Sequence, residues 1–414
     1  MKSVRSADRR LRNAIAHSLG LVTRFRPFVA SLLWVVVSLA GMTVASEARS
    51  QVRTPKDFIA GSDYRGLTHR ISFDSSGSAL MATHDALYSY NSGVLKRVAV
   101  AANSNMELAL APVGGIYAWL EHDRVPDGLF TVQLVKYPNR PLGQLRLADY
   151  PFGFSAVYFG GAGKLIVTAS PLDNPENAAG PYRYDFWDQR GRLLSTTRLQ
   201  GRAIGIVDID GNAILLLGES AATAFNRDGS VLWRLDGSFR KGALSDDGET
   251  ALLNPSQRSE INTVVVYDHG SMTRTVLNAP VHDLALAANG VDGAVAVDRG
   301  ELFFLSPRSC HGSTCLVRPV PTFPSSSDID ITDLRFVDGT TLVVATIQRS
   351  GNNPPYSFRT GAIHVVNSSG HPDYDFPVAL EQPAPGRPLI EATFGVRMFA
   401  THTPHRTVFV DLGP

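Results

Sequence analysis

Histidine stands beside charged residues at three places in the sequence: His84-Asp85, His122-Asp123 and, further on, His402 with His405-Arg406. Imidazole and carboxylate groups together bind zinc and other divalent ions, and they also perform general acid–base chemistry. If the segments that carry them lie side by side, four of the eleven histidines gather in one sector. His84, His122, His402 and His405 are therefore a candidate metal site. The alternative is that polar loops collect His and Asp because both tolerate solvent.

The chain contains two cysteines, Cys310 and Cys315, in the segment SPRSCHGSTCLV. Two cysteines across a short turn form a local disulfide in an oxidising compartment. A redox or metal pair with His311 is the alternative, but the spacing matches neither a two-residue redox motif nor a four-ligand zinc pattern. We therefore predict a disulfide between Cys310 and Cys315.

Motifs for other chemistry are missing from the sequence. No G-x-S-x-G nucleophile motif occurs, and no glycine loop of the phosphate-binding type occurs. Three acids, Asp328, Asp330 and Asp333, stand close together, and they suggest either a cation site or a solvated loop. We expect a protein that binds a partner rather than an enzyme, and we expect no cofactor unless a divalent metal occupies the histidine sector.

The elements that would position these residues recur along the chain. Eight times, two short apolar runs flank a glycine turn, with a period of about 45 residues, which is the size of a four-stranded propeller blade. Asp, Asn or Ser beside these glycines suits tight hairpins. The turns lie at Gly77, Gly114, Gly163, Gly211, Gly248, Gly290 to Gly293, Gly339 and Gly395. The pattern predicts an all-β protein, a β-propeller of eight four-stranded blades, with seven blades as the alternative.

The eighth repeat has only three strands, the last within residues 407–414 (TVFVDLGP). Residues 54–66 (TPKDFIAGSDYRG) precede the first repeat and belong to no other one. An unpaired strand edge promotes aggregation, and ring closure removes it. We therefore expect the segment 54–66 to supply the outer strand of the last blade, in a three-plus-one closure.

Long polar loops are expected on one face of the propeller, because the loops between second and third strands share a face with the connections between blades. Binding residues are usually found in loops. We predict that this long-loop face binds the partner, through aromatic and basic residues in and beside the third and seventh loops. These residues are Tyr182, Tyr184, Trp187, Arg349, Asn353, Tyr356, Phe358 and Arg359.

The N-terminal segment has the features of a signal peptide. Residues 28–45 are apolar and uncharged, Arg24 and Arg26 precede them, and small residues surround Ala48. We predict cleavage after Ala48, which leaves residues 49–414 as a single periplasmic or secreted domain. An uncleaved membrane anchor is the alternative, because about 18 apolar residues lie near the lower limit for a span.

Net charge bears on the class of partner. Seven of the 39 Lys and Arg residues and two of the 38 Asp and Glu residues lie in positions 1–48, so the remaining chain has a net charge of −4. A basic surface that could follow a phosphate backbone is not expected. We predict a protein or glycan partner, no nucleic acid, membrane contact only through an uncleaved N-terminal segment, and a monomeric state.

Short motifs in three repeats resemble those of known propeller families. ALSDDGETALL (residues 243–253) and ISFDSSGSALMAT (71–83) resemble the hairpins of WD40-like and Tol-type propellers, and AFNRDGSVLWRLDG (224–237) resembles a quinoprotein-type repeat. The resemblance covers residues from about 70 to 414 and implies the propeller fold. The predicted function is an exported binding module. The alternative is an exported hydrolase, lyase or oxidoreductase with a metal in the central funnel.

Overall fold

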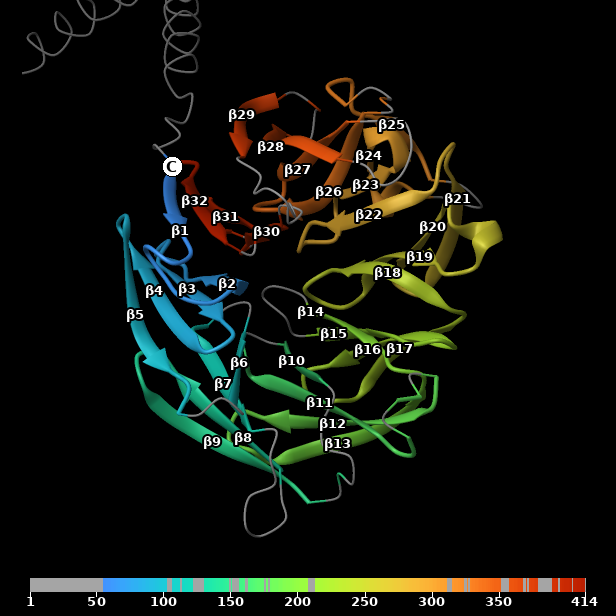
Figure 1. The fold of residues 1–414 in the computed structure, drawn as a ribbon. Coiled ribbons are helices and arrows are strands. Elements are labelled where there is room, and N and C mark those ends of the chain that lie inside the picture. Colours follow the sequence, from blue (N-terminus) through green and yellow to red (C-terminus); the bar gives the residue numbers. More distant parts are fainter. Residues whose placement is uncertain are drawn as a thin grey trace, which may run out of the picture. The chain divides into compact units, whose positions relative to one another are not determined.

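The chain folds into eight four-stranded antiparallel sheets that surround one axis as the blades of a β-propeller (Figure 1). The computed structural model describes residues 55–413 except 103–105, 112–113, 122–129, 149, 151–155, 161–162, 175, 178, 208–212, 311–314, 324–325, 327, 351–356, 368–369, 371, 379–388, 394 and 404. Residues 53–411 form one compact unit. The prediction of eight blades is confirmed, and the alternative of seven is wrong.

Each of the first four blades runs from the innermost to the outermost strand in chain order. The first blade consists of β2 (Thr68–Phe73), β3 (Ala79–Thr83), β4 (Ala86–Asn91) and β5 (Val94–Val100). The second consists of β6 (Met106–Leu110), β7 (Ile116–Glu121), β8 (Phe130–Lys136) and β9 (Arg140–Leu147). The third consists of β10 (Ala156–Gly160), β11 (Leu165–Pro171), β12 (Pro181–Asp188) and β13 (Leu193–Gln200). The fourth consists of β14 (Ile204–Val207), β15 (Ala213–Leu217), β16 (Ala221–Asn226) and β17 (Val231–Asp236).

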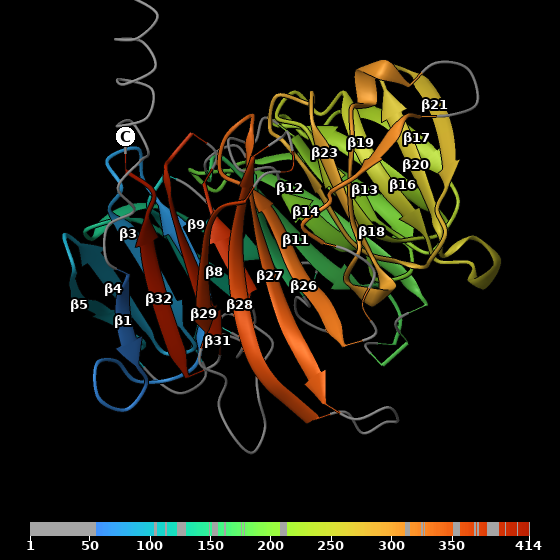
Figure 2. The ribbon, with the colours of Figure 1, turned by 90° about the horizontal axis from the view of Figure 1, so that it is seen from above.

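The next three blades follow the same order. The fifth consists of β18 (Phe239–Leu244), β19 (Thr250–Pro255), β20 (Thr263–Asp268) and β21 (Ser271–Val276), with the short helix η1 (Arg258–Glu260) between β19 and β20. The sixth consists of β22 (Val281–Leu286), β23 (Gly293–Val297), β24 (Leu302–Leu305) and β25 (Val317–Pro319), with η2 (Asp298–Gly300) and η3 (Pro307–Ser309) in its loops. The seventh consists of β26 (Ile329–Phe336), β27 (Thr341–Ser350), β28 (Ser357–Asn367) and β29 (Pro372–Val378), of which β26 to β28 lie side by side in Figure 2.

The eighth blade joins two distant parts of the chain, as the three-plus-one closure predicts. Its inner strands are β30 (Leu389–Ala392), β31 (Met398–Thr403) and β32 (Arg406–Asp411), and its outer strand is β1 (Lys56–Ile59). β1 pairs antiparallel with β32, so that Asp57 lies opposite Val408, and Arg406 Nε donates a hydrogen bond of 2.8 Å to Asp57 Oδ1. The ring of Phe409 stacks on Tyr90 of the first blade, with centroids 3.9 Å apart. The closing blade is therefore packed against its neighbour by aromatic contact.

The second strand of a blade is the most deeply buried. Every residue is buried in β3, β11, β15, β19 and β23. Such a strand has a blade on each side, so both of its faces are covered, and its sequence is a continuous apolar run rather than an alternating one. In the outermost strands β5 and β13, nearly all residues are exposed or half-buried. The core therefore lies between blades, in a series of interfaces around the ring.

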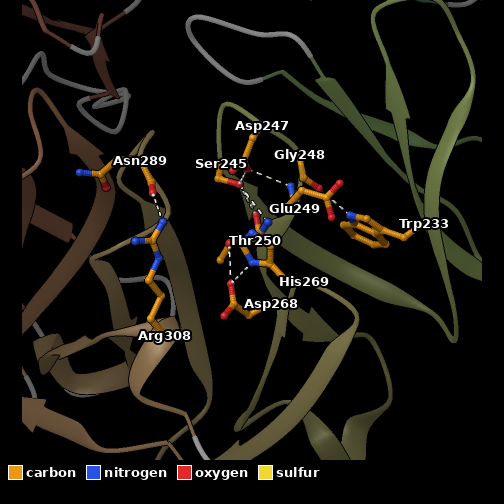
Figure 3. Close-up of polar contacts among 10 residues, drawn as sticks. All are labelled: Trp233, Ser245, Asp247, Gly248, Glu249, Thr250, Asp268, His269, Asn289 and Arg308. Carbon is orange, nitrogen blue, oxygen red and sulfur yellow. Dashed lines mark hydrogen bonds and ion pairs between the residues drawn. The ribbon is translucent and has the colours of Figure 1, made fainter.

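Figure 3 shows how the hairpin of residues 243–253 is built. Ser245 Oγ donates to Asp247 Oδ1 at 2.6 Å and accepts the N–H of Thr250 at 2.9 Å. Gly248 has φ +75°, and a Cβ there would lie 2.7 Å from Ala213 Cβ in the fourth blade, so only glycine fits. Trp233 Nε1 of that same blade donates to the Gly248 carbonyl at 2.6 Å. The turn therefore connects two blades as well as two strands.

The two cysteines form the predicted disulfide, Cys310–Cys315, between β24 and β25 of the sixth blade. It lies where the second hairpin of that repeat turns. Among the residues that the structure describes, no helix has the length and apolar character to cross a membrane. The segment 28–45 and the cleavage position after Ala48 lie outside those residues.

Candidate functional site

A β-bulge recurs in the innermost strands of the first, fifth, sixth and seventh blades. The pairing register shifts by one residue between Thr68 and Arg70, Phe239 and Lys241, Val281 and Asp283, and Ile331 and Asp333. In the second, third and fourth blades, β6, β10 and β14 pair with their neighbours without a shift. A bulge redirects side chains, and bulges are frequent beside binding and active sites. The bulges therefore set the innermost strands of the first, fifth, sixth and seventh blades apart from those of the second, third and fourth.

The residue that follows each bulge is charged, and these charges pair between blades. Lys241 Nζ lies 3.0 Å from Asp283 Oδ1, which joins the fifth blade to the sixth. Arg70 of the first blade lies 3.7 Å from Glu391 of the eighth. Six of the charged side chains on the innermost strands β2, β18, β22, β26 and β30 are named here the charged sector. Its members are Arg70, Lys241, Asp283, Asp333, Arg335 and Glu391.

Asp333 is the most buried member of the charged sector, with 5% of its surface exposed. Its Oδ1 accepts the N–H of Leu334 at 2.9 Å and lies 3.6 Å from Arg335, while its Oδ2 accepts the N–H of Ile390 at 2.8 Å. Burial raises the pKa of Asp333 to about 6, against the opposing charge of Arg335. Oδ2 of Asp333 therefore connects the seventh blade to the eighth, while Oδ1 is held within the seventh.

A pocket of about 370 Å³ opens beside the charged sector, between the fifth and sixth blades. It is lined by Arg240, Lys241, Ile261, Pro280, Val281, His282 and Asp298. These residues belong to the starts of β18 and β22, to the preceding blade connection, and to the loops between second and third strands. All of those segments are on the long-loop face. This pocket is named here the axial pocket.

Polar groups in the axial pocket fall into two kinds. Arg240 is fixed, because its Nε donates to Asn254 Oδ1 at 2.5 Å and its Nη2 donates to the carbonyl of Val281 in the next blade. His282 Nδ1 is buried and has no hydrogen-bond partner among the described residues. Burial, and then the charge of Lys241, lowers the pKa of His282, so its ring is neutral at pH 7. The pocket therefore combines a fixed cation with a neutral imidazole whose Nδ1 is unsatisfied.

The opposite part of the axis is less polar. Of the described side chains there, Leu108 and Leu110 of β6 and Phe159 of β10 are buried, and Glu107 carries the single charge of these two strands. The charges of the innermost strands are therefore concentrated, among the described residues, in the first, fifth, sixth, seventh and eighth blades.

The prediction that Tyr182, Tyr184 and Trp187 offer an aromatic surface to a partner is wrong in this structure. Their exposed fractions are 2%, 0% and 8%, because all three rings point into the core from β12. The hydroxyl of Tyr184 accepts the N–H of Ala203 at 2.6 Å, and Trp187 Nε1 donates to Thr168 Oγ1 at 2.9 Å. These aromatic residues connect the third blade internally and to the fourth.

A carboxylate is enclosed by the same blade. Asp185 is fully buried and accepts hydrogen bonds from Tyr150 at 2.7 Å, Thr196 at 2.5 Å and Arg183 at 2.9 Å. Burial, followed by the charge of Asp185, raises the pKa of Tyr150. A buried charge that is this well hydrogen-bonded specifies the packing of the blade.

The seventh-blade candidates lie at the edge of what the structure describes. Arg349 is in β27 opposite Phe358 in β28, and Arg359 follows Phe358. Asn353 and Tyr356 lie outside the described residues. The role of these five residues in partner binding stays a prediction.

The histidine candidates are distributed over different environments. His84 is exposed on the turn between β3 and β4, His405 is exposed on the turn between β31 and β32, and His402 is 3% exposed within β31. His122 lies outside the described residues. Among the described side chains, no group of three or more His, Cys, Asp or Glu is arranged to hold a metal ion. The structure does not bring His84, His402 and His405 into such a group.

Sequence reasoning missed the charged sector. Asp330 and Asp333, interpreted as part of a solvated loop or a cation site, are buried in β26, at 6% and 5% exposure. The available signal was the presence of charged residues among the apolar residues of a first strand, as in FRKGAL (239–244), VHDLAL (281–286) and IDITDLRF (329–336).

Comparison with known protein families found no matching family model, and comparison with curated proteins found no match.

Proposed function

We propose that this protein is an exported binding module that holds a protein or glycan partner at the long-loop face of its propeller. The observation that carries the proposal is the axial pocket, which opens on this face beside the charged sector. Its volume of about 370 Å³ is in the range of pockets that accept a small group or a side chain. The partner would insert one polar group there and lie across the surrounding loops.

The charges of the site favour a partner of mixed polarity. Lys241 and Asp283 are already paired with one another, and Arg240 is held by backbone and amide oxygens. A strongly charged ligand would have to break these pairs, whereas hydroxyl and amide groups can add hydrogen bonds to them. Hydroxyl-rich glycans and polar peptide segments have that chemistry. His282 is the neutral titratable residue that lines the pocket beside these groups.

Export is part of the same proposal. The apolar segment 28–45 after two arginines supports a signal peptide. The disulfide between Cys310 and Cys315 fits an oxidising compartment. Mass spectrometry of the protein purified from its own cells would test export directly, because cleavage after Ala48 leaves a chain that begins at Arg49.

The binding proposal is tested by screening the fluorescently labelled chain on a glycan array and a peptide array, followed by biolayer interferometry on each hit. The pocket variant is His282→Ala/Asp298→Ala. The control variant is His269→Ala/Glu249→Ala, which removes a histidine and an acid from hairpin turns of the neighbouring fifth blade (Figure 3). We expect at least a tenfold loss of affinity in the pocket variant and wild-type affinity in the control.

Thermal unfolding of both variants shows whether each is folded, so a loss of binding can be separated from a loss of structure. A hit that binds the pocket variant as tightly as the wild type would place the partner elsewhere. An absence of hits on both arrays would contradict a glycan or peptide partner.

A further inference from the structure

A second pocket lies on the opposite face of the propeller, at the tight hairpin turns of the third and fourth blades. Its volume is about 530 Å³, and its lining comes from three separate turns. The lining residues are Lys164, Asp188, Gln189, Arg190, Arg192, Leu194, Arg227 and Asp228. Lys164 precedes β11, residues 188–192 join β12 to β13, and residues 227–228 join β16 to β17. This pocket is named here the basic pocket.

Both acids of the basic pocket are engaged by their own turns. Asp188 Oδ1 accepts the N–H groups of Arg190 and Arg192, each at 2.9 Å, and its Oδ2 accepts Arg192 Nε at 3.2 Å. Asp228 Oδ1 accepts the hydroxyl of Ser230 at 2.6 Å and the N–H of Ser230 at 2.9 Å. These two carboxylates cap turns, and neither forms a hydrogen bond or ion pair with the side chain of Lys164, Arg190 or Arg227 among the described contacts.

Three cations of the basic pocket have no partner in the described structure. The side chains of Lys164, Arg190 and Arg227 are exposed, and no hydrogen bond or ion pair joins them to another described residue. Arg192 adds a fourth positive charge, which is paired with Asp188. The pocket therefore carries more positive than negative charge, although the chain after residue 48 has a net charge of −4.

The turns that carry the arginines are held rigidly by glycines. A Cβ on Gly191 would lie 2.4 Å from the carbonyl oxygen of Gln144 in the second blade, and a Cβ on Gly229 would lie 2.0 Å from Ser195 Oγ in the third. Ser195 Oγ also donates to the Gly229 carbonyl at 3.1 Å. These close approaches fix the backbone positions of Arg190 and Arg227 relative to one another. A ligand that binds both residues therefore has less backbone motion to restrict, which reduces the entropic cost of binding.

We propose that the basic pocket binds a tetrahedral oxyanion group, a phosphate or sulfate ester, carried on a small polar molecule such as a sugar. Guanidinium groups match such oxyanions with paired hydrogen bonds, and Arg190 and Arg227 approach from two different blades. The exposed lysine supplies a third positive charge, and Leu194 offers an apolar surface to the body of the ligand. The site is independent of the axial pocket, because its residues lie on the other face.

The test is isothermal titration calorimetry of the full chain with glucose 6-phosphate, glucose 6-sulfate and glucose, at low salt. The site variant is Arg190→Ala/Arg227→Ala. The control is Lys96→Ala/Arg97→Ala on the outer strand β5, which removes the same amount of charge from an exposed position. We expect one or both esters to bind, the site variant to lose at least tenfold in affinity, and the control to retain wild-type affinity.

The three ligands distinguish the source of the oxyanion. Binding of the phosphate alone, of the sulfate alone, or of both supports the site and identifies its ligand class. Three outcomes would overturn it: no heat from either ester, equal affinity for glucose, or an equal loss in the site and control variants. Circular dichroism melting verifies that both double variants are folded.

Discussion

The Nζ atom of Lys241 on β18 lies 3.0 Å from Oδ1 of Asp283 on β22, and this ion pair connects the fifth and sixth blades at the axis. The Lys241 side chain is 38% exposed, so solvent screens the attraction. A double-mutant cycle with Lys241→Met and Asp283→Asn should therefore give a coupling free energy of only about 0.5 kcal/mol. Urea unfolding at low and high salt measures it. A coupling that does not fall with salt would contradict this description of the pair.

The buried carboxyl of Asp333 should make the stability of the protein depend on pH. Because burial raises its pKa to about 6, the folded chain binds more protons than the unfolded chain between about pH 4 and 6. The stability that this group contributes is complete below the unfolded pKa and is lost as the pH rises through 6. Asp333→Asn should remove that part of the decline, measured by urea unfolding at several pH values. Asp236→Asn, at a carboxylate that is 87% exposed, should leave the decline unchanged.

Trp233 should stabilise the junction of the fourth and fifth blades through its indole N–H. Trp233→Phe keeps an aromatic ring beside Tyr267 but removes the 2.6 Å bond to the Gly248 carbonyl. The buried carbonyl loses its donor, and the free energy of unfolding should fall by about 1–3 kcal/mol. Tyr267→Phe, which preserves the ring packing, should cost less than about 0.5 kcal/mol. A loss for Trp233→Phe as small as the one for Tyr267→Phe would show that this hydrogen bond contributes little to stability.

The disulfide between Cys310 and Cys315 closes a short loop with a sequence separation of 5. Loop-closure entropy for so short a loop gives a stabilisation of no more than about 2 kcal/mol. Cys310→Ser/Cys315→Ser should therefore still fold, with a lower melting temperature. A reducing agent should lower the melting temperature of the wild type and leave that of the variant unchanged. A variant that fails to fold would show that the bond has a larger role.

The repeat architecture could be predicted because its signals are local. Turn glycines such as Gly77 and Gly248 stand between continuous apolar runs, and both adopt the positive φ that their hairpins require. The disulfide could be predicted because Cys310 and Cys315 stand where the repeat places the turn of its second hairpin. Closure by β1 could be predicted as well, because the eighth repeat lacks a strand and the first is preceded by an unassigned one.

The candidate site could not be predicted in the same way, because it depends on relationships between strands. Tyr182 and Tyr184 follow a polar loop in the sequence, yet β12 is covered on both sides by neighbouring blades, so their rings are buried. The bulges before Lys241, Asp283 and Asp333 are properties of pairing, since one strand gains a residue that its partner lacks. The two pockets are each assembled from loops of two blades.

The pairing of β1 with β32 also has a consequence for the order of folding. Asp57 and Val408 are opposite one another in the closing blade although almost the whole chain separates them. During synthesis, β1 must remain without its strand partner until β32 has emerged. Blades one to seven can each form from contiguous sequence, whereas the ring itself closes last. A chain interrupted before β32 would leave β1 exposed as an edge strand that can recruit other chains.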